Sequence, residues 1–166
     1  MFLKLGFVIH PTKSVLVPTQ ELEFLGFILN SVSMTIRLPP VKASIVQQAC
    51  ENLSNQDNPT IREVARVIGL IVSSLPGAQF GELHYRYLEH SKIEALRANK
   101  GDYDAFMTLS QEARAELHWW VQNVTSAFRN VIPNDPDLIL TTDASNTGWG
   151  AEIGRASCRE RVLRLV

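Results

Sequence analysis

The residue best suited to chemistry is Asp143, which follows a short apolar run and precedes a glycine-rich segment. Residues 138–151 read Leu-Ile-Leu-Thr-Thr-Asp-Ala-Ser-Asn-Thr-Gly-Trp-Gly-Ala, which predicts a hairpin with this carboxylate close to its turn. Hydrolysis by two metal ions needs several carboxylates converging on ions roughly 4 Å apart, and no partner carboxylate motif follows in the chain. The alternative interpretation is an ordinary turn aspartate, because Asp, Ser and Asn side chains bond nearby backbone groups.

Upstream, the N-terminal third has the pattern of short strands that would position a second group of candidates. Its apolar runs are bounded by Pro, Asn and Ser, as is typical of hairpins, and lie at residues 5–9, 15–17, 22–29 and 34–38. The continuous apolar stretch around Gly26 predicts burial on both faces, and the glycine would allow another backbone to approach closely. Lys13 lies in the Pro-Thr-Lys-Ser segment between the first two runs.

From residue 41 the apolar residues recur with helical period. A first helix is predicted to end at residues 55–59, with one apolar face made of Ile45, Val46, Ala49, Cys50 and Leu53. A second begins at Thr60, which forms a capping-box pattern with Glu63, and it ends at Pro76. This second helix is rich in apolar residues along its whole length.

Two further helices are predicted before the Asp143 segment. The third spans residues 78–96, with Phe80, Leu83 and Tyr87 facing inward. The fourth begins at the cap residue Ser110, and its apolar stripe comprises Leu117, Trp120, Val121, Val124 and Phe128. Residues 133–136 then separate this helix from the apolar run before Asp143.

In this order, the elements resemble the end of a reverse transcriptase followed by the start of its ribonuclease H domain. The likeness is greatest to retrotransposons of the DIRS and related types, and it covers residues 5–151. The motifs that carry it are Leu5-Gly6-Phe7, Pro11-Thr12-Lys13-Ser14, Glu23-Phe24-Leu25-Gly26-Phe27, Leu38-Pro39 with Lys42, Arg66-Val67-Ile68-Gly69-Leu70, His84-Tyr85-Arg86, Trp119-Trp120 and the segment around Asp143.

The resemblance implies an α+β fold in three parts. Residues 1–40 would be the palm end with a primer-grip-like hairpin, residues 41–132 a helical thumb and connection, and residues 133–151 the first hairpin of a ribonuclease H-like domain. The parent protein would copy RNA into DNA and cleave the RNA strand of the hybrid with Mg²⁺, so its partner would be an RNA/DNA primer–template.

The same resemblance implies roles for particular residues. Phe24, Leu25 and Gly26 would grip the primer terminus, although such residues are also common in a plain core. Lys13 would lie near the incoming nucleotide as a candidate proton donor to pyrophosphate, because a lysine pKa moves readily. The alternative for Lys13 is a solvated turn lysine. Asp143 would be a catalytic metal ligand, but only in a completed ribonuclease H domain.

The sequence departs from the family pattern at both ends. The two-aspartate polymerase motif does not precede residue 5, and the remaining ribonuclease H carboxylates do not follow residue 151. Residues 152–166 resemble a translated sequencing adapter, and we interpret them as a non-native tail that does not take part in the fold. We therefore expect an internal fragment of a retroelement polyprotein that is inactive by itself and binds no Mg²⁺ tightly.

The charge balance leaves two alternative functions open. The chain has 16 Lys and Arg against 17 Asp and Glu, and without the tail 12 remain against 15. A strong nucleic-acid binder usually has a basic excess or stripe. The alternatives are a non-catalytic nucleic-acid-binding helical module and an inert helical bundle. The basic residues are interpreted as solvated helix faces, with a template track as the alternative, at Lys42, Arg62, Arg66, Arg86, Lys92 and Arg97.

The remaining signals concern the compartment. Of two cysteines, Cys158 lies in the tail and Cys50 on an apolar helix face, so no disulfide partner is expected and a reducing, intracellular location (cytoplasmic or nuclear) is predicted. No signal peptide is evident. No apolar run approaches the ~20 residues of a membrane span, so no membrane partner is expected.

Overall fold

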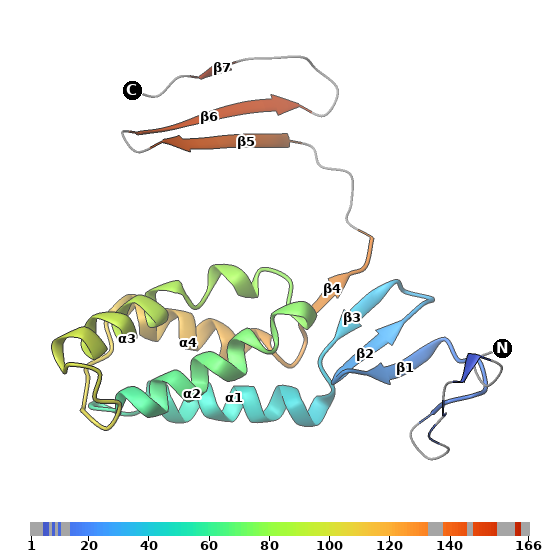
Figure 1. Cartoon of the computed structure of the whole chain (residues 1–166), viewed down its shortest axis with the longest axis horizontal. Coiled ribbons are helices and arrows are strands. Elements are labelled where there is room, and N and C mark those ends of the chain that lie inside the picture. The colour runs from blue at the N-terminus through green and yellow to red at the C-terminus, as the bar shows by residue number, and fades with distance from the viewer. Residues whose placement is uncertain are drawn as a thin grey trace. The chain divides into compact units, whose positions relative to one another are not determined.

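The computed structural model describes residues 5, 6, 8, 10, 14–132, 138–145, 148–155 and 162–163. The chain forms two compact units, Met1–Val131 and Ile132–Val166 (Figure 1). The predicted boundary between residues 40 and 41 falls within the first unit. Helices and strands occupy separate parts of the sequence, so the predicted α+β class is confirmed at that level.

The described part of the first unit contains four α-helices and two single turns of 3₁₀ helix. They are α1 (Pro40–Ser54), α2 (Ile61–Val72), α3 (Arg86–Ala98) and α4 (Gln111–Asn123), with η2 (Leu75–Gly77) and η3 (Gly81–Leu83) between α2 and α3. Helix α1 packs against α2 and α4, and α3 also packs against α2 and α4. Helices α2 and α4 therefore each pack against both α1 and α3.

Side chains near the helix starts explain where two of these helices begin. The hydroxyl of Thr60 accepts a hydrogen bond from the backbone N–H of Glu63, and the Glu63 carboxylate accepts one from the backbone N–H of Thr60. This reciprocal pair satisfies two N–H groups that have no partner within the helix. The Ser110 hydroxyl likewise accepts from the backbone N–H of Ala113 at the start of α4. Both predicted caps are confirmed.

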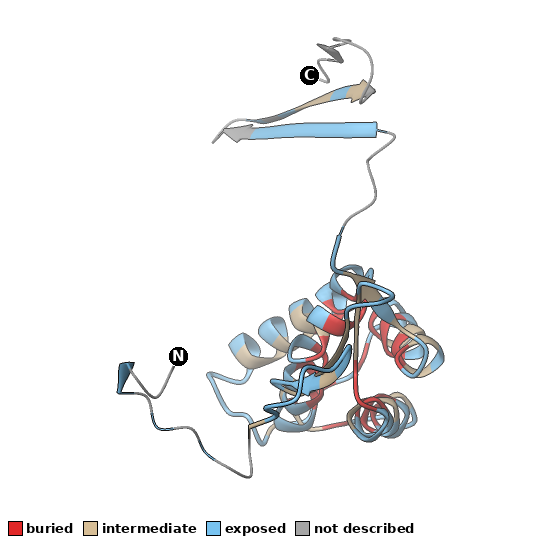
Figure 2. Cartoon of the chain, turned by 90° about the vertical axis from the view of Figure 1, so that its right-hand side faces the viewer, coloured by how far each residue is buried: buried red, intermediate tan, exposed pale blue. Residues whose placement is uncertain are grey.

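The core lies between the four helices, where buried residues gather in Figure 2. Its fully buried large side chains include Trp120 of α4, Leu88 of α3 and Ile61 of α2. Helix α1 contributes Ala43, Val46, Ala49, Cys50 and Leu53. Ile45, which was predicted on this face, is instead 53 % exposed, because a helix of 3.6 residues per turn places it to one side of the Val46–Ala49–Leu53 stripe.

A four-stranded antiparallel sheet completes the first unit. Its strands are β1 (Glu21–Phe24), β2 (Phe27–Asn30), β3 (Thr35–Arg37) and β4 (Phe128–Asn130), and they are paired in that order. Strand β4 follows the last helix and pairs with β3, with Ile36 opposite Arg129. The segments before and after the helices thus meet in one sheet, which Figure 1 shows beside one end of the helices.

The second unit is a long hairpin with a short third strand. Strand β5 (Leu138–Ser145) pairs antiparallel with β6 (Gly148–Arg155), and β6 pairs with β7 (Val162–Leu163). The hairpin predicted over residues 138–151 is confirmed. The prediction that residues 152–166 take no part in the fold is wrong for β7 and for the last four residues of β6. Their backbone groups extend the ladder, a pairing that needs no particular side-chain pattern.

Further expectations from the sequence are also corrected. Residues 15–17 form no strand, and neither do the described residues of the run at 5–9. The run at 22–29 is two strands joined by a turn, and none of its residues is buried. Phe128 lies in β4 and not on a helical stripe, because α4 ends at Asn123 and the chain turns back toward the sheet.

The segment between α2 and α3 differs from its predicted helix because it wraps around Trp120. A Cβ on Gly81 would lie 2.8 Å from the Trp120 ring, and the Trp120 indole N–H donates to the backbone oxygen of His84 at 2.6 Å. Helix α3 therefore begins only at Arg86. The three residues predicted to face inward here are more than half exposed, namely Phe80, Leu83 and Tyr87.

Candidate nucleic-acid interface

The predicted primer-grip residues lie together at the tip of the β1–β2 hairpin. Phe24 ends β1, Phe27 begins β2, and Leu25 and Gly26 form the two-residue turn between them. Both turn residues have positive φ, +51° for Leu25 and +76° for Gly26, which is the backbone of a type I′ turn. The tip is apolar and solvent-facing, since Phe24 is 55 % exposed and Leu25 80 % exposed.

Leu25 is an unfavourable residue for this position. Type I′ turns strongly prefer Asn-Gly, because asparagine tolerates the left-handed region and a branched or bulky side chain does not. Leucine does not favour this backbone conformation, and the Leu25 side chain gains no burial in return. The folding of the hairpin therefore does not account for an apolar residue at its tip.

A lysine from the first turn of α1 contacts the turn end of the hairpin. The Lys42 Nζ lies 4.4 Å from the centroid of the Phe27 ring and donates to the backbone oxygen of Ser73 at 3.0 Å. It also lies 3.9 Å from where a Cβ on Gly26 would be. One ammonium group therefore contacts both the hairpin and the residue that ends α2.

Most of the basic side chains on the described helices and strands interact within the fold. Ion pairs join Arg37 to Glu21, Arg62 to Asp104, Arg86 to Glu89 and Arg129 to Glu82. Arg114 donates to the backbone oxygens of Ser54 and Gln56 at the end of α1. These interactions account for two of the cations proposed as a template track, Arg62 and Arg86, and leave little support for a continuous basic stripe.

Neighbouring charges and burial shift several pKa values in the first unit. Hydrogen bonds from the backbone and side chain of Thr60 lower the pKa of Glu63. The hydrogen bond from Asn30, with the nearby Arg37 charge, lowers the pKa of Glu21. Burial raises the pKa of the Cys50 thiol to about 12. The first two groups stabilise local structure, and the third is a protonated core thiol at neutral pH.

Asp143 lies near the turn end of β5 and is exposed. Its partner in the ladder is Gly150, and Glu152 lies opposite Thr141, so the two carboxylates belong to one face of the hairpin at a diagonal spacing of roughly 7–8 Å. Among the described residues, no group of three or more His, Cys, Asp or Glu side chains could hold a metal ion together. The pair alone does not fit a two-ion centre, which needs several converging carboxylates.

The other sequence candidate, Lys13, lies outside the described residues. Glu152 was missed because the sequence interpretation placed it in the tail. The contact of Lys42 with Phe27 was missed because nothing in the sequence pairs a helix residue with a strand residue 15 positions earlier. The lysine itself was noted as a basic position, but its partners depend on how α1 packs beside the sheet.

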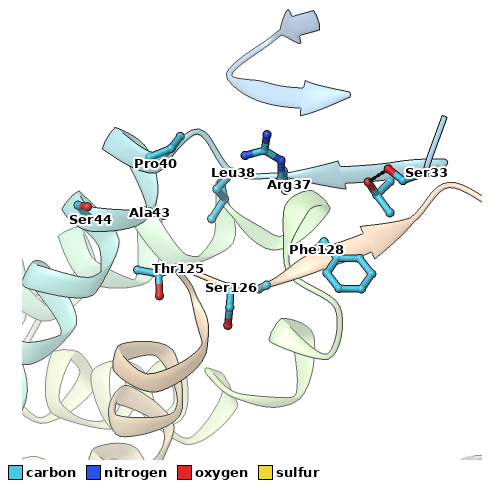
Figure 3. Close-up of a pocket in the computed structure, with 11 residues that line it drawn as sticks. Ser33, Arg37, Leu38, Pro40, Ala43, Ser44, Thr125, Ser126 and Phe128 are labelled. Atoms are coloured by element: carbon cyan, nitrogen blue, oxygen red, sulfur yellow. Dashed lines mark hydrogen bonds between the residues drawn. The ribbon is translucent and has the colours of Figure 1, made fainter. Parts of the chain in front are cut away.

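A cavity of about 590 Å³ lies between β3, β4 and the start of α1, and Leu38, Ala43 and Phe128 form apolar parts of its lining. Hydroxyl groups of Ser44, Thr125 and Ser126 also line it, but the Arg37 guanidinium points away from the latter two (Figure 3). Its polar groups do not converge on one point, so it does not have the form of an anion site.

No family model, curated protein or solved structure was found that matches this chain. In the part of the chain that the structure describes, no helix is both long and apolar enough to cross a membrane.

Proposed function

We propose that the first unit is a reverse-transcriptase-derived module that contacts a primer–template through the tip of the β1–β2 hairpin. The observation that carries this proposal is Leu25, an exposed leucine in a left-handed turn position that favours asparagine. Local departures from folding preferences concentrate at functional sites. An exposed apolar tip can pack against the sugars and base edges of a nucleic-acid strand, which is the role that the motif resemblance implies.

The affinity of such a contact is weak. Among the described residues of the first unit, most of the basic side chains on helices and strands already interact within the fold. Non-specific binding to nucleic acids comes mainly from Lys and Arg against phosphates. We expect a Kd on the order of 10⁻⁴–10⁻⁵ M for a labelled RNA–DNA primer–template at low salt. Fluorescence anisotropy across a salt series measures this value. No binding at the lowest salt would leave the inert helical bundle as the better description.

The Leu25→Asn variant separates binding from folding. Asparagine suits the left-handed turn, so the thermal stability of the variant should equal or exceed that of the wild-type protein. Its affinity for the primer–template should fall at least about fivefold, because the apolar tip is gone. Leu83→Asn is the matched control, since Leu83 is also an exposed leucine (67 %) but lies on η3. Equal affinities of the two variants would exclude the hairpin tip as the contact.

We also propose that β5 and β6 are the opening hairpin of a ribonuclease H-like domain, with Asp143 as one Mg²⁺ ligand of the parent enzyme. The support is the apolar strand that ends in Asp-Ala-Ser and the register that puts Asp143 opposite a glycine. A chimera carrying the remaining strands and helices of a related domain tests this. Asp143→Asn should reduce cleavage of an RNA–DNA hybrid by orders of magnitude, whereas Thr142→Ala, on the opposite face, should not.

A further inference from the structure

We propose that Lys42 is a positioning residue that fixes the orientation of the β1–β2 hairpin, and hence of its tip, relative to the helices. The inference rests on the proposed contact between the hairpin tip and nucleic acid. It adds that one side chain outside the hairpin holds the tip in a fixed orientation for this contact. Lys42 reaches the hairpin through Phe27 and Gly26 and reaches α2 through Ser73.

The end of α2 explains why a cation is needed at this place. The last carbonyls of a helix have no partner within it and form the negative end of the helix dipole. Helix α2 has no basic residue in its last turn, so the Lys42 ammonium at 3.0 Å from the Ser73 oxygen supplies that charge from α1. The ammonium is therefore held by the end of α2 as well as by the hairpin.

The contact with the hairpin also depends on the positive charge. An ammonium within about 6 Å of an aromatic centroid is attracted by the ring face, and the Lys42 Nζ lies 4.4 Å from the centre of Phe27. Phe27 follows the turn directly and pairs with Phe24. A ring held in this way restricts the tilt of the two-residue turn and keeps the exposed Phe24 and Leu25 side chains in one place.

Because Lys42 lies close to the hairpin tip, a direct contact of its ammonium with a phosphate is the alternative explanation for any loss of binding in a Lys42 variant. The two roles differ in their dependence on salt. A lysine that neutralises a phosphate contributes about 0.7–0.9 to the slope of log affinity against log salt. A lysine that only positions the hairpin contributes nothing to that slope, and its effect is present in the protein without nucleic acid.

The test compares Lys42→Met, Lys42→Arg and the control Lys92→Met in the full chain. Amide hydrogen exchange of the β1–β2 hairpin is measured in the free protein, and binding of the RNA–DNA primer–template is measured across a salt series. Lys42→Met should speed exchange of the hairpin amides about tenfold while leaving the α4 amides unchanged, and it should weaken binding with an unchanged salt slope. Lys42→Arg should restore most of both properties because its charge remains. Lys92→Met, on α3, should leave hairpin exchange as in the wild-type protein.

Unchanged hairpin exchange in Lys42→Met overturns the proposal, as does a salt slope reduced by about 0.7–0.9. If the variant unfolds, Phe27→Leu removes the ring under the ammonium and should speed hairpin exchange in the same direction. If the wild-type protein binds no primer–template, the proposed function fails, whereas the exchange measurements still decide whether Lys42 positions the hairpin.

Discussion

The two units differ in what their apolar residues contact. In the first unit, Trp120, Ile61 and Leu88 have no exposed surface. In the second, Leu138, Leu140 and Ile153 belong to one face of the hairpin and are 54 %, 57 % and 40 % exposed. The backbone ladder of the second unit is longer than any in the first, but its described residues contain no second layer to cover this face.

This difference shows that strand pairing alone does not make a core. An amphipathic sheet or helix becomes stable when its apolar face is buried against another element, and an isolated hairpin in water is marginal at best. The first unit meets this condition with four helices and a sheet. We therefore expect substitutions in the core of the first unit to lower the free energy of unfolding strongly and those on the β5–β6 hairpin to change it very little. The following measurements test that contrast.

The largest effect is expected for Trp120→Ala. Removal of a fully buried tryptophan should lower the free energy of unfolding by roughly 3–5 kcal/mol, and it also removes the hydrogen bond to the His84 oxygen. The neighbouring Trp119 is half-buried and stacks on His84, so Trp119→Ala should cost much less. Urea denaturation followed by circular dichroism measures both. Equal costs would show that α4 faces the core in a different register.

The next effect is expected for Glu116→Ala. Glu116 is buried on α4, and its carboxylate accepts hydrogen bonds from the backbone N–H groups of Tyr87 and Leu88. Helix α3 has no side-chain cap of its own, so the variant leaves both groups unsatisfied at a cost of about 1–3 kcal/mol. Glu94→Ala, on the exposed face of α3, is the control. A Glu116→Ala protein as stable as this control would mean that water replaces the carboxylate.

A pH effect of about 1 kcal/mol is expected from Cys50. Its pKa is about 12 in the folded protein against an ordinary value of 9.0. Above pH 9 the unfolded chain releases this proton while the folded protein keeps it, so this contribution to stability is complete below pH 9 and is lost as the pH rises toward 12. The stability difference between the wild-type protein and Cys50→Ala should therefore shift by about 1 kcal/mol between pH 8 and pH 10. An unchanged difference would place the thiol in contact with solvent.

A smaller effect is expected for Thr60→Ala. The variant loses the hydroxyl that caps α2 and one half of the capping box, which typically costs about 1 kcal/mol. The backbone and side-chain hydrogen bonds from Thr60 lower the pKa of Glu63, and the variant loses only the side-chain bond, whose stabilising effect is present at neutral pH. It is lost as the pH falls below 4.5 through the folded pKa of Glu63. The difference in stability between the wild-type protein and Thr60→Ala should therefore become smaller below pH 4.5. Thermal melts of both proteins at pH 7 and pH 3.5 measure this change.

The smallest effect is expected for Leu140→Thr in β5. Leu140 is exposed, so the free energy of unfolding of the first unit should change by less than about 0.5 kcal/mol. Hydrogen exchange should find the β5 amides far less protected than those of α1 and α4. Strong protection of β5, lost in the variant, would mean that this apolar face is covered in solution and that the contrast between the units is false.

Local sequence signals predicted several elements well. The capping box at Thr60, the Ser110 cap, the start of the first helix and the hairpin containing Asp143 depend on residues within a few positions of each other. The place of Trp120 in the apolar stripe of the fourth helix followed from helical period alone and is confirmed by its burial. Such features need no knowledge of distant contacts, because the interacting groups are close in the chain.

Long-range packing explains the errors. Residues 78–85 carry apolar side chains that suggested a helix, but this segment bends around Trp120, some 40 positions later. Phe128 continued a helical period, yet it pairs with Arg37 in β3. The candidate site likewise depends on both local and long-range features. The sequence indicated Phe24, Leu25 and Gly26 as site residues, whereas the contact of Lys42 with Phe27 depends on how α1 packs beside the sheet.

By itself, then, the sequence determined three of the four described helices, the caps of α2 and α4, and the hairpin over residues 138–151. Only the tertiary structure decided that the first and last strands of the first unit form one sheet, which residues surround Trp120 and which cation lies beneath Phe27. The physical reason is that the two kinds of feature involve residues at different separations along the chain. Hydrogen bonds within a turn or a cap involve neighbours, whereas burial and charge placement depend on segments that only folding brings together.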